Sequence, residues 1–388
     1  MIRLRNQHDA LIDKTVLTGF TVTRIQNPVA LFETGVLVKQ SGPQKRILLD
    51  NCAFNSIQIP KSKLFDRFVY THSPHGLYAE LDLSIQEHIP ADELSAGHYK
   101  QEYHNLNCWH VADLKCRIVR IVGYLYGTYG ITLDVSTIRI RSIEINRTFL
   151  MDFEFPLYER PIVFTMSLLS PMLRLKERNF FPVEHRSDVI GEQRRIPSTY
   201  IKDSGRRGIA VKLYDKGTQL KEITGLDTFP QCMRFELTLK APKKVRDYLN
   251  SDLVSQLTDQ RINQCLNAFI TEHILDHYPS RLRQRDIYIE KLFRSLSKSG
   301  DRYWRRSFLL DLIHQENSSH VPFLLSLDSA TFRPILAKTF SKRSRSFRHD
   351  TLDSLKTYCA NHCRVFLQGD DSRLRELFEK LLPDDAAL

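Results

Sequence analysis

GIAVKLYDKG, at residues 208–217, combines the pattern of a β-strand with a reactive side chain at its end. Isoleucine, valine and leucine alternate with other residues in this stretch, and a period of two places them on one face of a strand. Tyr214 falls on the opposite face, between Lys212 and Lys216. A phenol held beside two cations favours the phenolate and can keep a phosphate next to it. The stretch therefore predicts a strand that presents a tyrosine nucleophile.

A second strand pattern with a polar face follows in MRFELTLK, residues 233–240. Its methionine, phenylalanine and leucines alternate with a polar set that includes Arg234 and Glu236. The period of two again separates the two sets onto opposite faces. A nucleophile strand followed by a strand that presents arginine and glutamate indicates phosphodiester chemistry on a sheet.

A third strand pattern, Thr137 to Phe149, supplies a further acid, because Glu144 and Asn146 share the face opposite two isoleucines. If the three strands are neighbours, Glu144 and Glu236 can hold a hard divalent cation through oxygen. Such a cation neutralises a scissile phosphate. Asp215 is a third candidate ligand, although strict alternation points it away from Tyr214.

Each acid also has a plainer interpretation when it is taken alone. Glu144 fits a solvent-facing acid on an edge strand, and Glu236 fits a structural ion pair with Arg234. His72 and His75, in THSPHG, are candidate metal ligands or polar turn residues, and the turn is favoured. Glu80 and Asp82 on the strand that follows are candidate site acids or solvated residues. Cys359 and Cys363 are favoured as structural cysteines, because no second pair lies nearby.

Composition restricts the classes of protein that the chain can belong to. Its 388 residues suffice for two domains. No apolar stretch is long enough for a membrane span, and the N-terminus lacks the apolar region of a secretory signal. The seven dispersed cysteines favour a reducing cytoplasm. Without a G-x-x-x-x-G-K-[ST] motif, a nucleotide cofactor is not supported.

The charge of the chain favours a polyanionic partner. Lys and Arg number 56 against 45 Asp and Glu, a net charge of +11. Basic residues concentrate after residue 190, and the stretches RYWRR (302–306) and SKRSRSFR (341–348) interleave aromatic residues with arginine. Surfaces that follow a nucleic-acid backbone and stack on its bases have this composition, whereas a single basic run more often forms a solvated face.

The order of patterns along the chain predicts an α+β protein. Short β-branched or aromatic runs fill the first 85 residues, among them VALFETGVLV at 29–38, and a helix is expected over 108–129. The segment 155–178 is expected to be helical, and strands are expected at 198–202, 208–214 and 232–240. From about residue 243 the pattern is helical, at 243–250, 259–277, 282–297, 303–315, 347–367 and 371–382. We therefore expect a first domain over 1–250 and an all-helical second domain over 251–388.

Three motifs in this order resemble those of the rolling-circle replication initiators of filamentous phages, the gene II protein family, and more distantly the plasmid Rep_trans initiators. The motifs are SIEINRTF (142–149), GIAVKLYDKG (208–217) and MRFELTLK (233–240). The resemblance covers roughly residues 70–245. It implies a central antiparallel sheet with flanking helices, related to the His-hydrophobic-His endonucleases. The chain departs from those enzymes because it has no clean His-hydrophobic-His triplet.

The resemblance also implies an activity. Tyr214 matches the nucleophile of the family, which nicks one DNA strand, forms a 5′-phosphotyrosyl bond and leaves a 3′-OH primer. Lys216 matches the lysine two residues on, and Glu144 and Glu236 match the acids that bind Mg or Mn. A two-tyrosine relay is not supported, because the motif holds one tyrosine. The implied partners are single-stranded or hairpin DNA of a replication origin and the host helicase and polymerase, with no membrane.

The sequence thus predicts a phage or plasmid initiator that nicks and joins DNA through Tyr214, with the helical domain over 251–388 adding DNA binding. Two alternatives stay open. A conjugative or mobilisation relaxase uses the same chemistry and differs in its origin and transfer partners. A non-catalytic DNA-binding phage regulator would show the same basic surface but would form no covalent bond to DNA.

Overall fold

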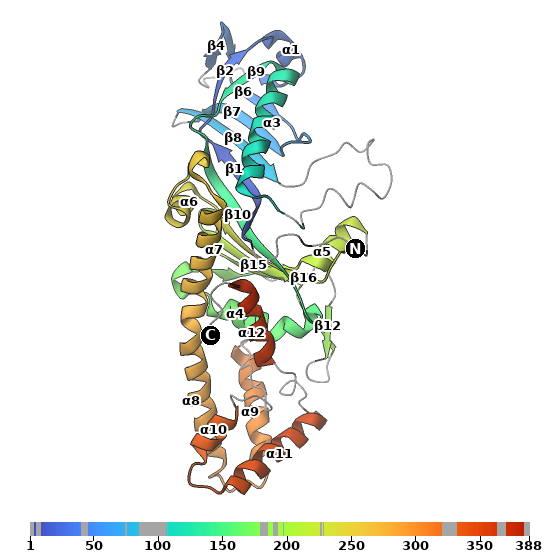
Figure 1. Cartoon of the computed structure of the whole chain (residues 1–388), viewed down its shortest axis with the longest axis vertical. Helices are drawn as coiled ribbons and strands as arrows, with labels where there is room; N and C mark the ends of the chain where they lie inside the picture. Colours follow the sequence, from blue (N-terminus) through green and yellow to red (C-terminus); the bar gives the residue numbers. More distant parts are fainter. Residues whose placement is uncertain are drawn as a thin grey trace.

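The computed structural model describes residues 4, 9–39, 46–73, 76–84, 106, 108–178, 185–188, 193–196, 198–225, 227, 229–319, 332–362 and 370–383. The molecule is elongated, with a β-rich part at one end of its long axis and a helical part at the other (Figure 1). The last described helix returns from the helical part to the middle of the molecule.

Ten strands form one antiparallel sheet, in the order β11-β14-β15-β16-β10-β1-β8-β7-β6-β3. These strands are β1 (Leu11–Thr18), β3 (Leu37–Val38), β6 (Ser56–Ile59), β7 (Arg67–Ser73), β8 (Gly76–Ser84), β10 (Arg139–Leu150), β11 (Lys176–Glu177), β14 (Thr199–Asp203), β15 (Ile209–Asp215) and β16 (Cys232–Leu239). Three further pairs are β2 (Thr21–Ile25) with β9 (Ile131–Asp134), β4 (Ile47–Leu49) with β5 (Cys52–Phe54), and β12 (His185–Asp188) with β13 (Gln193–Ile196).

The described α-helices are α1 (Pro28–Glu33), α3 (Val111–Tyr129), α4 (Glu159–Leu168), α5 (Lys216–Thr224), α6 (Pro242–Leu249), α7 (Asp259–His273), α8 (Tyr278–Leu296), α9 (Trp304–Ser319), α10 (Phe332–Thr339), α11 (Arg345–His362) and α12 (Asp370–Leu381). Helices and a large antiparallel sheet thus make up one chain, as the α+β prediction requires.

The three strand motifs lie on adjacent strands, β15, β16 and β10. Tyr214 on β15 lies opposite Arg234 on β16, and Glu236 lies opposite Asn146 on β10. Directly opposite residues of antiparallel strands point to the same face of the sheet. The register therefore gathers the polar positions of all three motifs on one face.

The other face of these strands is apolar and belongs to the main hydrophobic core. Ile145 and Leu237 are fully buried there, together with Phe269 of α7 and Phe378 of α12. Helix α7 begins where the Thr258 hydroxyl accepts a hydrogen bond from a backbone N–H of the first turn, which caps the helix. Its buried residues recur every three or four positions, so one apolar stripe faces the sheet.

A second hydrophobic core holds the helical part together. It is formed by α8, α9, α10 and α11 around Phe293 and Phe308, whose rings stack with centroids 3.8 Å apart. The sequence places a boundary near residue 250, whereas α6, α7 and α12 pack with the sheet. The two cores meet within α8, because this helix contributes to the main core near Leu282 and to the second core from Ile289 onward.

Other differences from the expected elements have local causes. Residues 28–33 lie in a strand-like run but form α1, because the Asn27 side chain caps the helix and Pro28 occupies its first turn. Of the expected helical segment 155–178, α4 covers 159–168, and β11 then joins the sheet at 176–177. Helix α10 was not expected. Within the described part of the chain, no helix is long and apolar enough to cross a membrane.

Candidate active site

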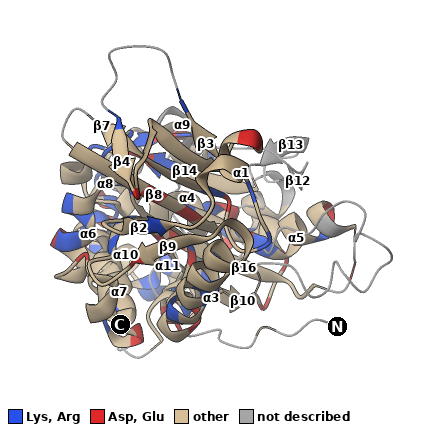
Figure 2. Cartoon of the chain, turned by 90° about the horizontal axis from the view of Figure 1, so that it is seen from above, with Lys and Arg blue, Asp and Glu red and all other residues tan. Residues whose placement is uncertain are grey.

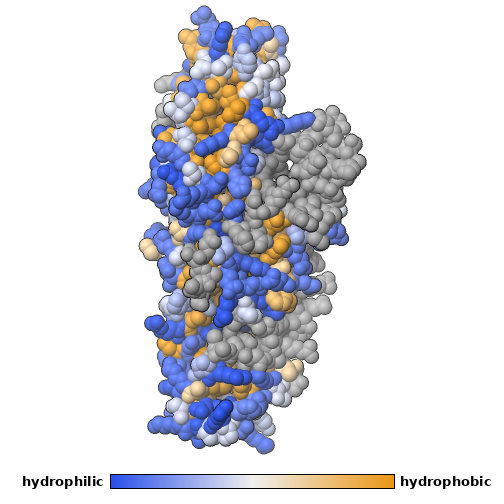
Figure 3. Space-filling view, viewed as in Figure 1, coloured by the Kyte–Doolittle hydropathy of each residue, from blue (hydrophilic) through white to orange (hydrophobic). Residues whose placement is uncertain are grey.

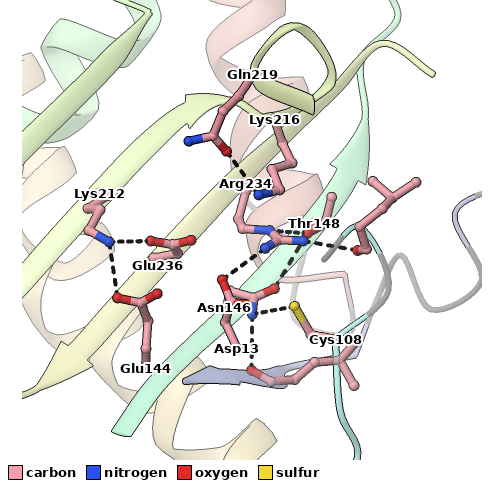
Figure 4. Close-up of polar contacts among 12 residues, drawn as sticks. Asp13, Cys108, Glu144, Asn146, Thr148, Lys212, Lys216, Gln219, Arg234 and Glu236 are labelled. Carbon is pink, nitrogen blue, oxygen red and sulfur yellow. Dashed lines mark hydrogen bonds and ion pairs between the residues drawn. The ribbon is translucent and has the colours of Figure 1, made fainter. Parts of the chain in front are cut away.

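The polar face of β15, β16 and β10 forms a compact cluster of charged groups (Figure 4). Tyr214 is 4% exposed, and its Oη donates a hydrogen bond to Glu236 Oε1 at a distance of 2.5 Å. Burial and the charge of Glu236 raise the pKa of Tyr214 well above its usual value. The phenol is therefore protonated in this arrangement, and its nearest proton acceptor is Glu236.

Lys212 joins the two glutamates of the sequence motifs. Its Nζ lies 2.7 Å from Glu236 Oε2 and 3.0 Å from Glu144 Oε2. Burial would lower the pKa of Lys212, but the two carboxylates outweigh burial and raise it. The sequence interpretation that Lys212 favours a phenolate at Tyr214 is therefore not supported, because this ammonium neutralises Glu236 and Glu144 instead.

The two glutamates differ in their electrostatics. Burial would raise the pKa of Glu236, yet Lys212 and Arg234 outweigh burial and lower it. For Glu144, burial and the neighbouring charge of Glu236 raise the pKa despite Lys212. Thr238 also donates a hydrogen bond to Glu144 Oε2, at 3.0 Å. Glu236 is therefore the carboxylate of the pair that stays ionised to lower pH.

Arg234 is fully buried and holds the cluster to the neighbouring strands. Its Nε donates to Thr148 Oγ1 at 2.7 Å, and its terminal nitrogens donate to the Leu106 carbonyl at 2.9 Å and to Asp13 Oδ2 at 3.2 Å. These bonds satisfy much of the guanidinium, as burial of a charge demands. Leu106 lies outside the sheet, so one of these contacts ties the Arg234 end of the cluster to a residue beyond the three motif strands.

Lys216 begins α5 directly after the tyrosine strand and is buried. Its Nζ donates to Gln219 Oε1 at 2.9 Å and lies 5.5 Å from the centroid of the Tyr214 ring. Burial and the charge of Arg234 lower the pKa of Lys216 to about 8. Lys216 is thus close to Tyr214, as the motif spacing predicts.

The residues present fit a divalent cation. Carboxylate oxygens of Asp13, Glu144 and Glu236 all lie within 4.8 Å of one another. Three carboxylates are a hard oxygen donor set, which suits Mg or Mn. A cation held by both glutamates would compete with the Lys212 ammonium for the same oxygens.

Asp215 lies outside this group. Its Oδ1 accepts a hydrogen bond from the Thr218 backbone N–H at 2.9 Å, and its Oδ2 accepts from Thr218 Oγ1 at 2.7 Å. The carboxylate therefore caps α5. The third acid beside Glu144 and Glu236 is Asp13, not Asp215.

Asp13 was not identified from the sequence. It lies in β1, at a bulge where the register with β10 shifts between Ile12 and Lys14. A bulge adds one residue and breaks the alternation of faces, so a period of two cannot assign the side on which Asp13 lies. An aspartate inside the apolar run LIDKTVL is the one signal that marked it.

The remaining candidates lie elsewhere. His72 is on β7, which β8 and β1 separate from β10, and His75 and Cys363 lie outside the described residues. Glu80 forms ion pairs with Arg67 and Arg141, and Arg67 also pairs with Asp82 at 3.2 Å, so these acids belong to a network on β8. Cys359 is buried in the second core.

Comparisons with known proteins leave the function to be argued from these residues. No protein-family model matches the chain, and no curated protein matches it. Among solved structures, the chain is similar to a rolling circle replication initiator protein from Geobacillus stearothermophilus, with 12% identity and a TM-score of 0.27. The match covers 60% of this chain and 74% of that one. A TM-score this low does not establish a shared fold, so the likeness carries no argument here.

Proposed function

We propose that this chain is a replication initiator that nicks and rejoins one DNA strand, with Tyr214 as the nucleophile. The observation that carries the proposal is the hydrogen bond from Tyr214 to Glu236, inside a cluster that also holds Asp13 and Glu144. A phenol and three carboxylates, one of which can act as its base, are the groups that metal-assisted phosphodiester transfer needs.

The step conserves phosphodiester bonds. Glu236 accepts the proton of Tyr214 as Oη attacks the scissile phosphorus, and the bond from phosphorus to the 3′-oxygen breaks. The proton that Glu236 has accepted, or one exchanged for it from water, passes to the leaving 3′-oxygen, which departs as a 3′-OH. The downstream strand stays attached to Tyr214 through its 5′-phosphate. The reverse reaction rejoins the strand. One phosphodiester replaces another, so no nucleotide cofactor is consumed.

The remaining residues of the cluster have supporting roles in this proposal. Lys216, beside the Tyr214 ring, is placed to attract the phosphate. Asp13, Glu144 and Glu236 would hold Mg or Mn, which would neutralise charge on the phosphate. Because Tyr214 is 4% exposed, a DNA strand reaches it only if the residues packed around it move. The bacterial cytoplasm, origin DNA and the host helicase and polymerase complete the proposed setting, and a relaxase would use the same site.

A second candidate is favoured by one specific observation, the neutralisation of Glu144 and Glu236 by Lys212. The cluster would then be a buried ion network that fixes the sheet of a non-catalytic DNA-binding protein. Buried ion pairs of this kind occur without a catalytic role. The two candidates differ in one respect that can be measured, the formation of a covalent bond to DNA.

The test uses the full chain, Mn and a pool of hairpin oligonucleotides with randomised loops. Each hairpin carries one dye at its 5′ end and a different dye at its 3′ end. On a denaturing gel we expect the 3′ dye to migrate with the protein and the 5′ dye to appear on shortened free DNA that a polymerase extends. The adduct should disappear with EDTA. If no denaturant-resistant adduct forms on any hairpin, the non-catalytic candidate replaces the nickase.

A further inference from the structure

The two arginine-rich runs of the sequence meet at one end of the helical part, although residues 307–340 separate them. The rings of Trp304 and Phe340 have centroids 6.1 Å apart, and the rings of Phe340 and Phe347 have centroids 5.3 Å apart. The guanidinium of Arg348 also donates to the Phe340 carbonyl at 3.5 Å. The beginning of α9 and the connection from α10 to α11 are therefore neighbours, at the end far from the sheet (Figure 1).

Two of the three aromatic residues of these runs, Trp304 and Phe347, pack against the second core, and arginines lie over their rings. Trp304 is 9% exposed and belongs to the second core, and Phe347 packs against that core. Arg305 lies over the Trp304 ring at 4.9 Å, and Arg343 lies over the Phe347 ring at 5.4 Å. Stacking on a packed ring restricts a guanidinium, so less entropy is lost when the group binds an anion.

These cations have no acidic partner among the described residues. No described ion pair involves the seven basic residues of the surface, namely Arg302, Arg305, Arg306, Lys342, Arg343, Arg345 and Arg348. The nearest acid in sequence, Asp301, instead accepts hydrogen bonds from the Tyr303 backbone N–H at 2.7 Å and from Ser307 Oγ at 3.0 Å. We call these seven residues the distal basic surface. Its charge is available to an external anion.

Figures 2 and 3 show the surroundings of these residues. Viewed down the long axis, Lys and Arg gather on the side that holds α6, α8, α10 and α11 (Figure 2). In the space-filling view, hydrophilic side chains dominate the lower end of the molecule (Figure 3). The seven cations themselves attract a polyanion over several ångströms and raise its association rate.

The burial of the aromatic residues distinguishes between two forms of DNA. Proteins that bind single strands stack the bases on exposed aromatic rings. Here Tyr303, 64% exposed, is the one aromatic residue of the two described runs that is open to solvent. Contacts to the backbone of a duplex need cations alone, because the bases stay stacked inside the helix. The sequence interpretation of these runs as a base-stacking surface is therefore not supported.

We propose that the distal basic surface binds the phosphate backbone of duplex DNA, without reading its sequence. The inference deepens the proposed function, because it adds a duplex contact to a protein that would cut a single strand at Tyr214. It rests on the proposed function for the identity of the polyanion and on the arginine geometry for the form of the DNA. Duplex held at this end would anchor the protein beside an unpaired strand.

The test measures binding apart from nicking, so that failure of one proposal is distinguishable from failure of the other. The full chain with Tyr214→Phe is titrated with a labelled random-sequence duplex and with a single strand of the same length, over a range of salt concentrations. The triple change Arg343→Ala, Arg345→Ala, Arg348→Ala is compared with its parent. The log–log salt slope for the duplex should flatten by about one to three units, close to 0.9 for each phosphate that the variant no longer neutralises.

A matched control removes the same charge at the opposite end of the molecule. Arg24, Lys39 and Lys61 are exposed and lie in the β-rich part, so their triple change to alanine should leave the slope unaltered. Thermal melting by circular dichroism verifies that both triple variants fold. Tyr303→Ala should weaken duplex binding less than the distal triple change does, since a duplex offers no base for stacking and the ring supports one guanidinium, that of Arg302.

Three results would overturn the duplex proposal. The first is a duplex salt slope that the distal triple change leaves unaltered. The second is an equal flattening of that slope by the control triple change. The third is a loss of affinity for the single strand alone, caused by both Tyr303→Ala and the distal triple change. The last result would assign the surface to single-stranded DNA. None of these results depends on whether Tyr214 is a nucleophile, because the parent protein cannot use it.

Discussion

On the polar face of the sheet, Tyr214 Oη donates a hydrogen bond to Glu236 Oε1, at a distance of 2.5 Å. The second oxygen of the same carboxylate lies 2.7 Å from Lys212 Nζ. One buried group thus contacts both the candidate nucleophile and an internal cation. Burial and the charge of Glu236 oppose ionisation of Tyr214. The phenol can therefore attack only if a base takes its proton and a nearby cation balances the negative charge that forms on its oxygen.

The first prediction concerns Tyr214→Phe. This change removes Oη alone, so we expect nicking and the covalent adduct to be abolished while DNA affinity stays within a few-fold. The ring still fills its buried site, which limits the effect on stability to roughly the net value of one hydrogen bond, about 1 kcal/mol. Adduct formation is measured on a denaturing gel, and affinity by fluorescence anisotropy.

Tyr200→Phe is the matched control for this prediction. Tyr200 lies on the adjacent strand β14 and is also buried, but it pairs with Leu213 and therefore faces the apolar side of the sheet. We expect the Tyr200 variant to retain the adduct. An adduct that survives in the Tyr214 variant and disappears in the Tyr200 variant would reassign the nucleophile.

The second prediction concerns the two glutamates. Glu144→Ala and Glu236→Ala should each remove Mn-dependent cleavage, because each deletes one of three carboxylates that approach one another within 4.8 Å. EDTA should inhibit the wild-type protein in the same way. Cleavage is measured as initial rate against Mn concentration, and full activity of either variant at low Mn would exclude that residue from the metal site.

The third prediction separates Asp13 from Asp215. Asp13→Asn keeps an oxygen for Arg234 but removes the charge, so the Mn affinity should fall by at least about tenfold. Asp215→Asn leaves Mn affinity unaltered, because asparagine also caps a helix well and Asp215 lies outside the carboxylate group. Isothermal titration with Mn compares the two. Loss of affinity in the Asp215 variant alone would restore the ligand set expected from the motif spacing.

The sequence located much of this site because the register of the sheet follows from alternation. Tyr214, Glu236 and Glu144 occupy polar positions where β15, β16 and β10 pair without a shift of register, and such stretches keep the period of two. Asp13 escaped because a bulge interrupts that period in β1. The ion pairs of the site were also not predictable from the sequence, because they join residues on different strands. Lys212, for example, contacts carboxylates on two other strands.

The helical part shows the same division between local pattern and tertiary packing. The helices α7, α8, α9 and α11 follow from apolar spacing, but the packing of α7 against the sheet is set by long-range contacts. One of them is the hydrogen bond from the Ala10 backbone N–H to Asn263 Oδ1 at 2.8 Å. A domain boundary predicted near residue 250 from local sequence pattern cannot take such long-range contacts into account.

The fourth prediction concerns acid stability. Burial lowers the pKa of His273 below its usual value of 6.5, with Glu272 opposing and His277 and Lys244 adding to the effect. As pH falls below 6.5, the unfolded chain binds this proton before the folded one does, so stability decreases with falling pH until the lowered pKa is reached.

His273→Gln tests this expectation. Glutamine can keep a hydrogen bond to Tyr248 Oη, which lies 3.2 Å from His273 Nε2, and it does not titrate. The wild-type protein should therefore lose more melting temperature than the variant when the pH is lowered from neutrality through this window. Equal losses in both proteins would show that other groups govern the acid response.

The last prediction concerns Lys212→Met, which removes the internal cation between Glu144 and Glu236. Without metal the variant should be less stable, by about 3–5 kcal/mol, because two carboxylates lose their buried partner. Mn should then bind more tightly than in the wild-type protein, since no ammonium competes for the same oxygens. A ligand at about a hundred times its dissociation constant stabilises by ~2.7 kcal/mol, so the melting temperature should recover with Mn.

Lys240→Met is the matched control for this prediction. It breaks an ion pair with Asp203 on the same sheet, with a distance of 2.7 Å, and should show no such recovery. If Mn stabilises neither the Lys212 variant nor the wild-type protein, the carboxylates form a structural ion network, and the metal-assisted step of the proposed reaction falls with it.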